Sequence, residues 1–103
     1  MRTHKRKPAE VERSAERTLV DLEDLLRRLS IEVTYDRRLE GKGGVCRVRG
    51  ARRIIVQRGL PASEKVDLLL EGLRDVDLSG LDVPESVRER LLGIARARGA
   101  AGR

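Results

Sequence analysis

Aromatic side chains are almost absent from this sequence of 103 residues: it contains no Phe and no Trp, and Tyr35 is its only aromatic residue. Proteins that bind single-stranded nucleic acid usually stack the bases on aromatic rings, so this mode of binding is nearly excluded. The core must be packed from Leu, Val and Ile instead. A hydrophobic content of 39% supports a modest core, and the length corresponds to one domain.

Histidine and cysteine occur once each, as His4 and Cys46. A single cysteine excludes an intramolecular disulfide, and one His with one Cys cannot supply the ligands of a zinc site. His4 lies in an N-terminal tail, so no Cys–His or Ser–His pair is held ready for nucleophilic catalysis. The acidic residues lack the spacing of a calcium loop, and the glycine-rich stretches lack the Gly-Lys-Ser/Thr of a phosphate-binding loop. We therefore expect no metal, no cofactor and no catalytic residues, and predict that the protein is not an enzyme.

Long apolar runs are missing as well. No stretch approaches the roughly 18 apolar residues that cross a membrane. The basic N-terminus, MRTHKRKPAE, leads into charged sequence rather than into the apolar segment of a secretory signal. Together with the single cysteine, these absences predict a cytoplasmic protein with no membrane partner. The sequence implies no small-molecule substrate.

The sequence does contain a clear pattern for a long helix at its start. Residues 8–29 begin with Pro8, which suits the first turn of a helix, and their apolar positions follow the 4-3 spacing of a helix that packs along one face. These positions are Val11, Ala15, Thr18, Leu22, Leu25 and Leu29. Two interpretations stay open. The stripe packs on the rest of its own domain, or Val11, Ala15, Thr18 and Leu22 contact a second copy in a homodimer.

Three strands and two further helices follow. The strands are expected at 31–36, 45–49 and 53–57, a helix at 64–76 after a Ser63 cap, and a last helix from Pro84. The order α-β-β-β-α-α predicts an α+β fold, in which a small three-stranded antiparallel sheet is packed by a long N-terminal helix and two C-terminal helices. The single domain is expected to span 8–96, between disordered basic tails at 1–7 and 97–103.

The second and third strands are expected to form a hairpin with a loop centred on Ala51. This loop would pair Val48 with Ile54 and Cys46 with Val56 on one apolar face, because register follows the pattern of burial. The opposite face would then carry Arg47, Arg49, Arg53, Gln57, Val45 and Ile55.

Charge is distributed unevenly, although the net charge is only +6. Residues 37–58 hold eight basic residues against Glu40 alone, whereas 10–36 and 60–90 each hold four basic and eight acidic residues. The candidate contacts for an anion or an acidic partner are Arg47, Arg49, Arg52, Arg53 and Arg58. Three interpretations stay open. The arginines pair with the acidic residues of the flanking helices or keep an exposed sheet edge from aggregating, the hairpin binds nucleic acid, or it binds an acidic protein partner.

Gly72 lies inside the helix predicted at 64–76, where glycine costs about 1 kcal/mol relative to alanine. With Leu68 one turn earlier, it would form a shallow notch that lets another helix approach closely. The last helix of the same domain is the expected occupant, and a second chain is the alternative. Leu68 and Gly72 are therefore candidate helix–helix or dimer contacts.

The stretch IIVQRGLPASEKVDLLLEGLRDVD, residues 54–77, is similar in layout to the small ImmA/IrrE-type zinc peptidases. In that family a strand leads through a short loop into a helix that carries His-Glu-x-x-His. The resemblance implies that Glu71 matches the general base, while Leu70 and Arg74 stand in place of the two zinc-binding histidines. A base with no metal-bound water to activate has no task. The resemblance therefore implies a non-catalytic relative of the family, whose helix packs or binds.

These observations predict a non-enzymatic, small cytoplasmic protein-interaction or regulatory module. Its partner would be another protein or a second copy of itself, and the domain would be a degenerate relative of the zinc peptidases. The alternative is a nucleic-acid-binding module that uses the basic hairpin at 45–58 and the basic tails.

Overall fold

The structure is a computed structural model that describes residues 8–101, with side chains described for residues 9–94. Its elements are α1 (Pro8–Arg28), β1 (Glu32–Asp36), β2 (Gly43–Val48), β3 (Ala51–Gln57), α2 (Ala62–Glu71) and α3 (Glu85–Ala101). This order confirms the predicted α+β fold of one helix, three strands and two helices. None of the described helices is both long enough and apolar enough to cross a lipid bilayer.

The two predicted tails lie mostly at the limits of the described chain. The segment predicted as a tail at 1–7 and the last two residues of the one predicted at 97–103 lie outside the described residues. Between these limits, the backbone of α3 stays helical to Ala101. Alanine and arginine, which dominate this end of the chain, are among the best helix formers.

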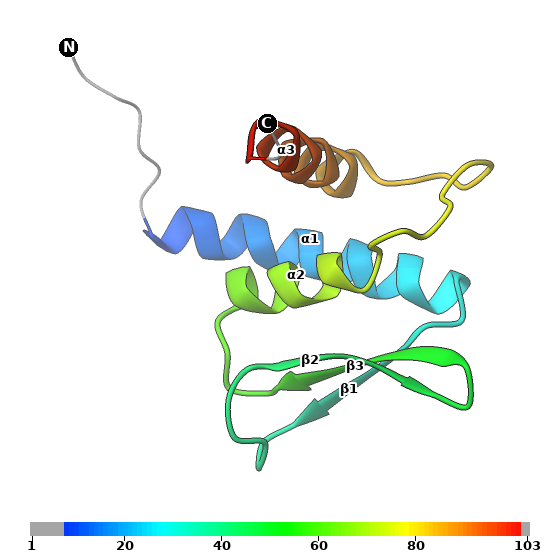
Figure 1. Ribbon diagram of the computed structural model, residues 1–103. Coiled ribbons are helices and arrows are strands. Elements are labelled where there is room, and N and C mark those ends of the chain that lie inside the picture. Colours follow the sequence, from blue (N-terminus) through cyan, green and yellow to red (C-terminus); the bar gives the residue numbers. More distant parts are fainter. Residues whose placement is uncertain (1–7, 102–103) are drawn as a thin grey trace.

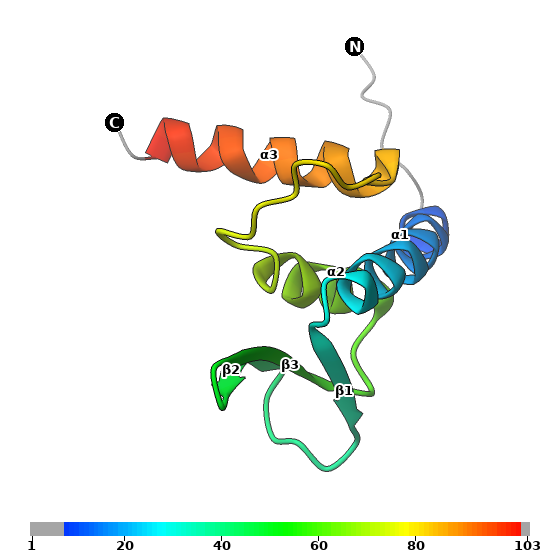
Figure 2. The ribbon, with the colours of Figure 1, turned by 90° about the vertical axis from the view of Figure 1, so that its right-hand side faces the viewer.

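The elements form three layers (Figures 1 and 2). The sheet is the first layer, α1 and α2 lie side by side across one of its faces, and α3 lies on the far side of these two helices. The largest fully buried side chains are Leu22, Leu25, Leu26, Ile54, Leu69, Val56, Val66 and Val87. They come from all three layers, and five of the eight belong to α1 and α2, so the α1–α2 layer forms the centre of the core. No described helix covers the other face of the sheet, which we call the outer face.

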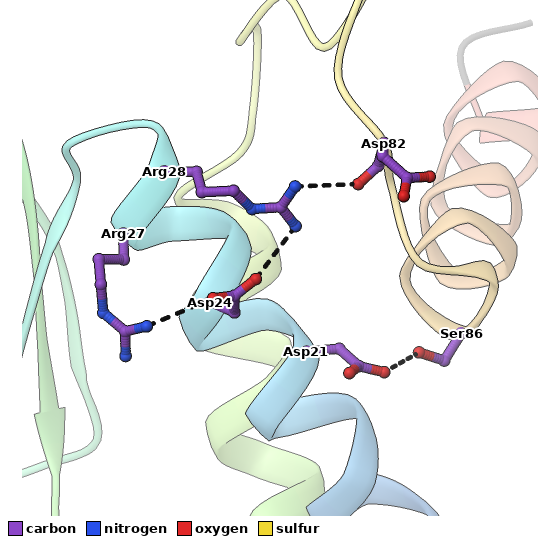
Figure 3. Close-up of polar contacts among 6 residues, drawn as sticks. All are labelled: Asp21, Asp24, Arg27, Arg28, Asp82 and Ser86. Carbon is purple, nitrogen blue, oxygen red and sulfur yellow. Dashed lines mark hydrogen bonds and ion pairs between the residues drawn. The ribbon is translucent and has the colours of Figure 1, made fainter.

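Polar contacts from α1 reach the start of α3 and the loop before it (Figure 3). Val87 is fully buried, and the Ser86 hydroxyl donates a hydrogen bond to the Asp21 carboxylate at 3.0 Å. Before the helix starts, Nη1 of Arg28 donates to the Asp82 carbonyl at 3.4 Å. The first turns of α3 and the loop before it are therefore the parts tied to α1.

The sheet is mixed, so the prediction of a wholly antiparallel sheet is wrong. β3 lies in the centre, with β1 on one side and β2 on the other. β1 runs parallel to β3, with Val33 opposite Ile54 and Tyr35 opposite Val56, whereas β2 runs antiparallel to β3. Burial explains this order. β3 presents Ile54 and Val56 to the helices and a half-buried Ile55 to the outer face, which suits a central strand, while the glycine-containing β2 takes an edge.

The turn of the hairpin lies earlier than predicted. Arg49 and Gly50 form a two-residue turn with φ of +53° and +83°, and positive φ at both central residues is the requirement of a type I′ turn. Val48 therefore pairs with Ala51, and the predicted loop centred on Ala51 is wrong. A type I′ turn matches the twist of the two strands, which explains why the shorter turn is favoured.

The new register moves the side chains of β2 to the opposite faces, because it differs from the predicted one by an odd number of residues. Val45 lies opposite Ile54 and Arg47 opposite Arg52, on the face toward the helices. Cys46 and Val48 accordingly lie on the outer face, together with Arg53 and Ile55. The predicted pairs of Val48 with Ile54 and of Cys46 with Val56 do not form.

Helix α2 starts and ends earlier than the helix predicted at 64–76. Ser63 does not cap it. Pro61 occupies the cap position, and the carboxylate of Glu12 on α1 accepts hydrogen bonds from the backbone N–H groups of Ala62 (2.8 Å) and Ser63 (3.2 Å). A carboxylate at this end satisfies unpaired N–H groups and interacts favourably with the helix dipole. At its other end, α2 stops at Gly72.

Candidate functional site

The five arginines predicted as anion or acidic-partner contacts do not form one surface. Arg47 and Arg52 lie opposite each other on the helix-facing side of the β2–β3 pair, and Arg49 lies in the adjoining turn. Arg53 lies on the outer face, and Arg58 follows β3 at the opposite end of the sheet. The structure therefore brings together three of the five, at the turn end of the hairpin.

The acidic elements around the hairpin neutralise little of its charge by direct contact. Arg53 forms an ion pair with Glu32 of β1 at 2.7 Å. Among the described side chains, no carboxylate oxygen lies within 4.0 Å of the guanidinium nitrogens of Arg47, Arg49 or Arg58. The turn end of the hairpin thus keeps its positive charge.

Arg52 fixes the position of the turn end against α2. Its Nη1 donates hydrogen bonds to the backbone carbonyls of Gly72 (2.9 Å) and Arg74 (2.6 Å). These carbonyls lie at and just beyond the end of α2, where unpaired carbonyl groups carry partial negative charge. The hairpin and the end of α2 are therefore tied together, and a cleft lies between them.

This cleft, which we call the edge cleft, has a volume of about 390 Å³. Its lining consists of Val45, Cys46, Arg47, Arg52, Glu71, Arg74 and Asp75. The hairpin contributes one wall and the end of α2 the other. The lining contains three arginines and two carboxylates, so the edge cleft is polar and carries a net positive charge. A second cavity of about 240 Å³ adjoins it beneath α3, shares Glu71, Arg74 and Asp75, and is otherwise lined by apolar side chains.

The edge of β2 borders the edge cleft and has no neighbouring strand in the described part of the chain. The backbone N–H of Gln57 donates to the Lys42 carbonyl at 2.9 Å, so these two residues form a hydrogen-bonded pair. Hydrogen-bonded and non-hydrogen-bonded pairs alternate along an antiparallel ladder. It follows that the N–H and C=O groups of Gly43, Val45 and Arg47 point away from β3.

The predicted dimer stripe on α1 is used inside the domain. Ala15 and Leu22 are fully buried and Thr18 is 2% exposed, whereas Val11 is 40% exposed. The Thr18 hydroxyl donates to the Ser14 carbonyl at 3.1 Å. The stripe therefore packs on the chain's own core, and of its four candidate dimer contacts only Val11 lies at the surface.

The predicted notch at Leu68 and Gly72 is also occupied from within. A Cβ on Gly72 would overlap Cδ1 of Ile54 and lie 3.0 Å from its Cγ1. The occupant is thus a side chain of β3, and the expectation that α3 fills the notch is wrong. Leu68 is itself buried. Glycine is needed at position 72 because the end of α2 packs closely on the sheet.

The three positions matched to the zinc-peptidase motif lie in different surroundings. Leu70 is 5% exposed and belongs to the core, Glu71 is the exposed last residue of α2, and Arg74 lies in the turn beyond it. Within the described residues, no group of three His, Cys, Asp or Glu side chains is placed to hold a metal ion.

Glu71, Arg74 and Asp75 were not predicted to meet the hairpin. Each looks like an ordinary solvated charge in the sequence, and the edge cleft arises only from the type I′ register and the bonds of Arg52. The Glu12 cap was missed for a similar reason, because it lies far from Ala62 in the chain. The only usable signal was Gly50, which marks the true turn.

The chain matches no protein-family model, and comparison with curated proteins and with solved structures gives no match either.

Proposed function

We propose that the chain is a non-enzymatic protein-interaction module that accepts an extended segment of another protein along the edge of β2. The observation that carries this proposal is the row of outward-pointing backbone groups on Gly43, Val45 and Arg47 beside the edge cleft. Proteins that add a strand to a sheet edge obtain affinity from such main-chain hydrogen bonds and specificity from adjacent pockets. The edge cleft supplies such a pocket.

The contacts of the described residues favour this edge over the other candidate surfaces. Ala15, Thr18 and Leu22 are buried, so a second copy cannot use them without opening the core. Natural sheets often protect a free edge by covering it with a helix or loop, whereas here no described strand pairs with β2 on its side away from β3, and the end of α2 leaves a cleft beside it. We also propose that the protein is located in the cytoplasm, because a chain with a single cysteine forms no internal disulfide and needs no oxidising environment.

The proposal also includes a relation to the ImmA/IrrE-type peptidases in which the catalytic helix has become a packing helix. Leu70 in the core supports this idea, because the helix position that would hold a zinc ligand now fills the space between α2 and its neighbours. The edge cleft would then serve binding without chemistry.

Nucleic-acid binding is the second candidate function. It is favoured by Arg47 and Arg49, which have no carboxylate within ion-pair distance among the described side chains. Arg53 and Arg58 lie on another face and at another end of the sheet, however, so the hairpin does not present one continuous basic surface. We therefore place this function second, and an oligonucleotide arm in the experiment of the next subsection tests it.

The strand-acceptor proposal is tested with a displayed library of random linear peptides selected on the full chain. Val45→Pro removes one outward N–H group without touching the ladder to β3, and proline is tolerated at such edge positions. Val45→Ala removes most of the same side chain but keeps the N–H group, and is the matched control. We expect Val45→Pro to weaken selected peptides about tenfold, as the loss of one or two main-chain hydrogen bonds predicts.

Val45→Ala should weaken the same peptides far less, and circular dichroism should show both variants folded. Failure to select any peptide, or equal affinities for the Val45→Pro variant and the original chain, would contradict the proposal.

A further inference from the structure

We infer that the segment bound along β2 runs antiparallel to it and carries an acidic residue followed three residues later by an aromatic residue. The inference rests on the proposed function, because it specifies the chemistry of the partner at the same edge. It follows from the different character of the two sides of β2, from the charge at the turn end, and from the missing side chain at Gly44.

The two sides of the β2 edge offer different partners to an added strand. Val45 and Arg47 lie on the side toward the helices and border the edge cleft, whose lining also includes the intervening Cys46. On the outer side stand Gly44, Cys46 and Val48, which carry no charge. Side chains of a bound strand alternate between the two sides, so the partner is expected to alternate in character as well.

The acidic position is assigned by Arg47. Its side chain is exposed, borders the edge cleft, and has no carboxylate within 4.0 Å among the described side chains. Arg52 across the ladder directs its Nη1 toward backbone carbonyls, so Arg47 is the guanidinium nearest the edge that is available to a partner. A carboxylate opposite Arg47 in an added strand would lie within reach of its planar donors.

Charge also argues against a second copy as the occupant. Residues 37–58 hold eight basic residues and one acidic residue, Glu40. Pairing two β2 edges would bring two such segments together, and like charges opposite each other destabilise a sheet. An acidic segment is complementary to the same surface, and complementarity of this kind selects partners.

The aromatic position is assigned by Gly44. A Cβ built on Gly44 would have no other atom within 4 Å. Gly44 lies opposite Ile55 of β3, whose side chain is half-buried on the outer face. A large side chain from an added strand can lie over this glycine and contact Ile55, as aromatic residues do over glycines at sheet edges. In an antiparallel strand, the residue opposite Gly44 comes three residues after the one opposite Arg47, and on the opposite side.

The experiment uses peptides selected on the full chain, with three variants in addition to Val45→Pro. We expect the selected sequences to be enriched in Glu or Asp followed three residues later by Phe, Tyr or Trp. Replacing the acidic residue of a selected peptide by Gln should weaken binding about two- to fivefold, the range of a partly exposed ion pair. With the Arg47→Gln variant the Glu and Gln peptides should bind equally, whereas Arg58→Gln, at the other end of the sheet, should keep the difference.

Gly44→Val provides an independent arm, because the open space around Gly44 admits a side chain without disturbing the fold. This variant should lose the preference for an aromatic residue and retain the preference for an acidic one. Suppose that Val45→Pro weakens peptide binding, but the selected peptides prefer neither an acidic nor an aromatic residue at these positions. This result would overturn the inference and leave the proposed function standing. Absence of any selected peptide would overturn both.

A short DNA duplex and a single-stranded oligonucleotide complete the design. Binding of either one that falls with Arg47→Gln, together with peptide binding that does not, would assign the turn end to nucleic acid and overturn the inference. A stable dimer by light scattering that Val45→Pro dissociates would assign the edge to a second copy, with the same consequence.

Discussion

At the scale of single residues, Gly72 shows how one contact reverses an expectation from helix propensity. Alanine is the better helix former, so an exposed glycine at a helix end gains from substitution. Here a Cβ would overlap Cδ1 of Ile54, and overpacking a tight contact typically costs about 1–3 kcal/mol. The contact with Ile54, rather than helix propensity, is therefore expected to determine how a substitution at position 72 changes the stability.

We therefore predict that Gly72→Ala lowers the free energy of unfolding by about 1–3 kcal/mol, measured by chemical denaturation. Ile54→Val removes the overlapping Cδ1 atom and alone costs about 0.5–1.5 kcal/mol. In the double variant the two losses should be less than additive, because the overlap is gone. A more stable Gly72→Ala variant would contradict the close packing of α2 on β3.

The residue scale also shows which parts of the site could be predicted. The stripe through Ala15, Thr18 and Leu22 could be predicted because helical periodicity is a local property of the sequence. The neighbour of Gly72 could not, because it depends on how a strand and a helix meet. The sequence indicated that this glycine has a packing reason, but it did not indicate Ile54 as that reason.

At the scale of elements, α1 and α2 are joined by the Glu12 cap as well as by their apolar faces. Hydrogen bonds from Ser63, and the backbone N–H of Ala62, hold the pKa of the Glu12 carboxyl below its ordinary value of 4.5. A carboxyl whose pKa is lower in the folded state stabilises the fold above its unfolded pKa. That contribution is lost as the pH falls through the folded pKa.

The prediction at this scale concerns the pH dependence of stability. Glu12→Gln should lower the melting temperature at pH 7 and flatten its decline on acidification below about pH 4.5. Glu16→Gln, an exposed position on the same helix, serves as the matched control and should leave the decline intact. Identical pH profiles for Glu12→Gln and the original chain would show that the cap contributes nothing.

The hairpin marks the limit of prediction for elements. Three strands were recognisable from alternation, yet the order of the strands and the register of β2 were not. The turn at Arg49 and Gly50 places a bulky residue at positive φ, where Asn or Asp is more usual, so the local signal was weak. The order depends on which strand is apolar on both faces, and Ile55 of β3 was the available evidence.

At the scale of the whole molecule, the described helices leave one face of the sheet uncovered (Figure 2), and β2 has no described strand on its side away from β3. The acidic segments lie mainly in the helices, and the basic segment lies in the sheet and its loops. The molecule is thus polarised, with the β2 edge on the basic side. This arrangement could not be predicted from charge alone, because it requires β2 to be an edge strand.

The most direct test of the account is amide hydrogen exchange at β2, measured by NMR before and after addition of a selected peptide. In the free chain, the amides of Gly44, Cys46 and Val48 should be protected by their bonds to β3, while those of Gly43, Val45 and Arg47 exchange rapidly. Saturating peptide should slow the exchange of Val45 and Arg47. Protection of Val45 and Arg47 already in the free chain, or no change on binding, would contradict the claim that β2 is an edge open to a partner.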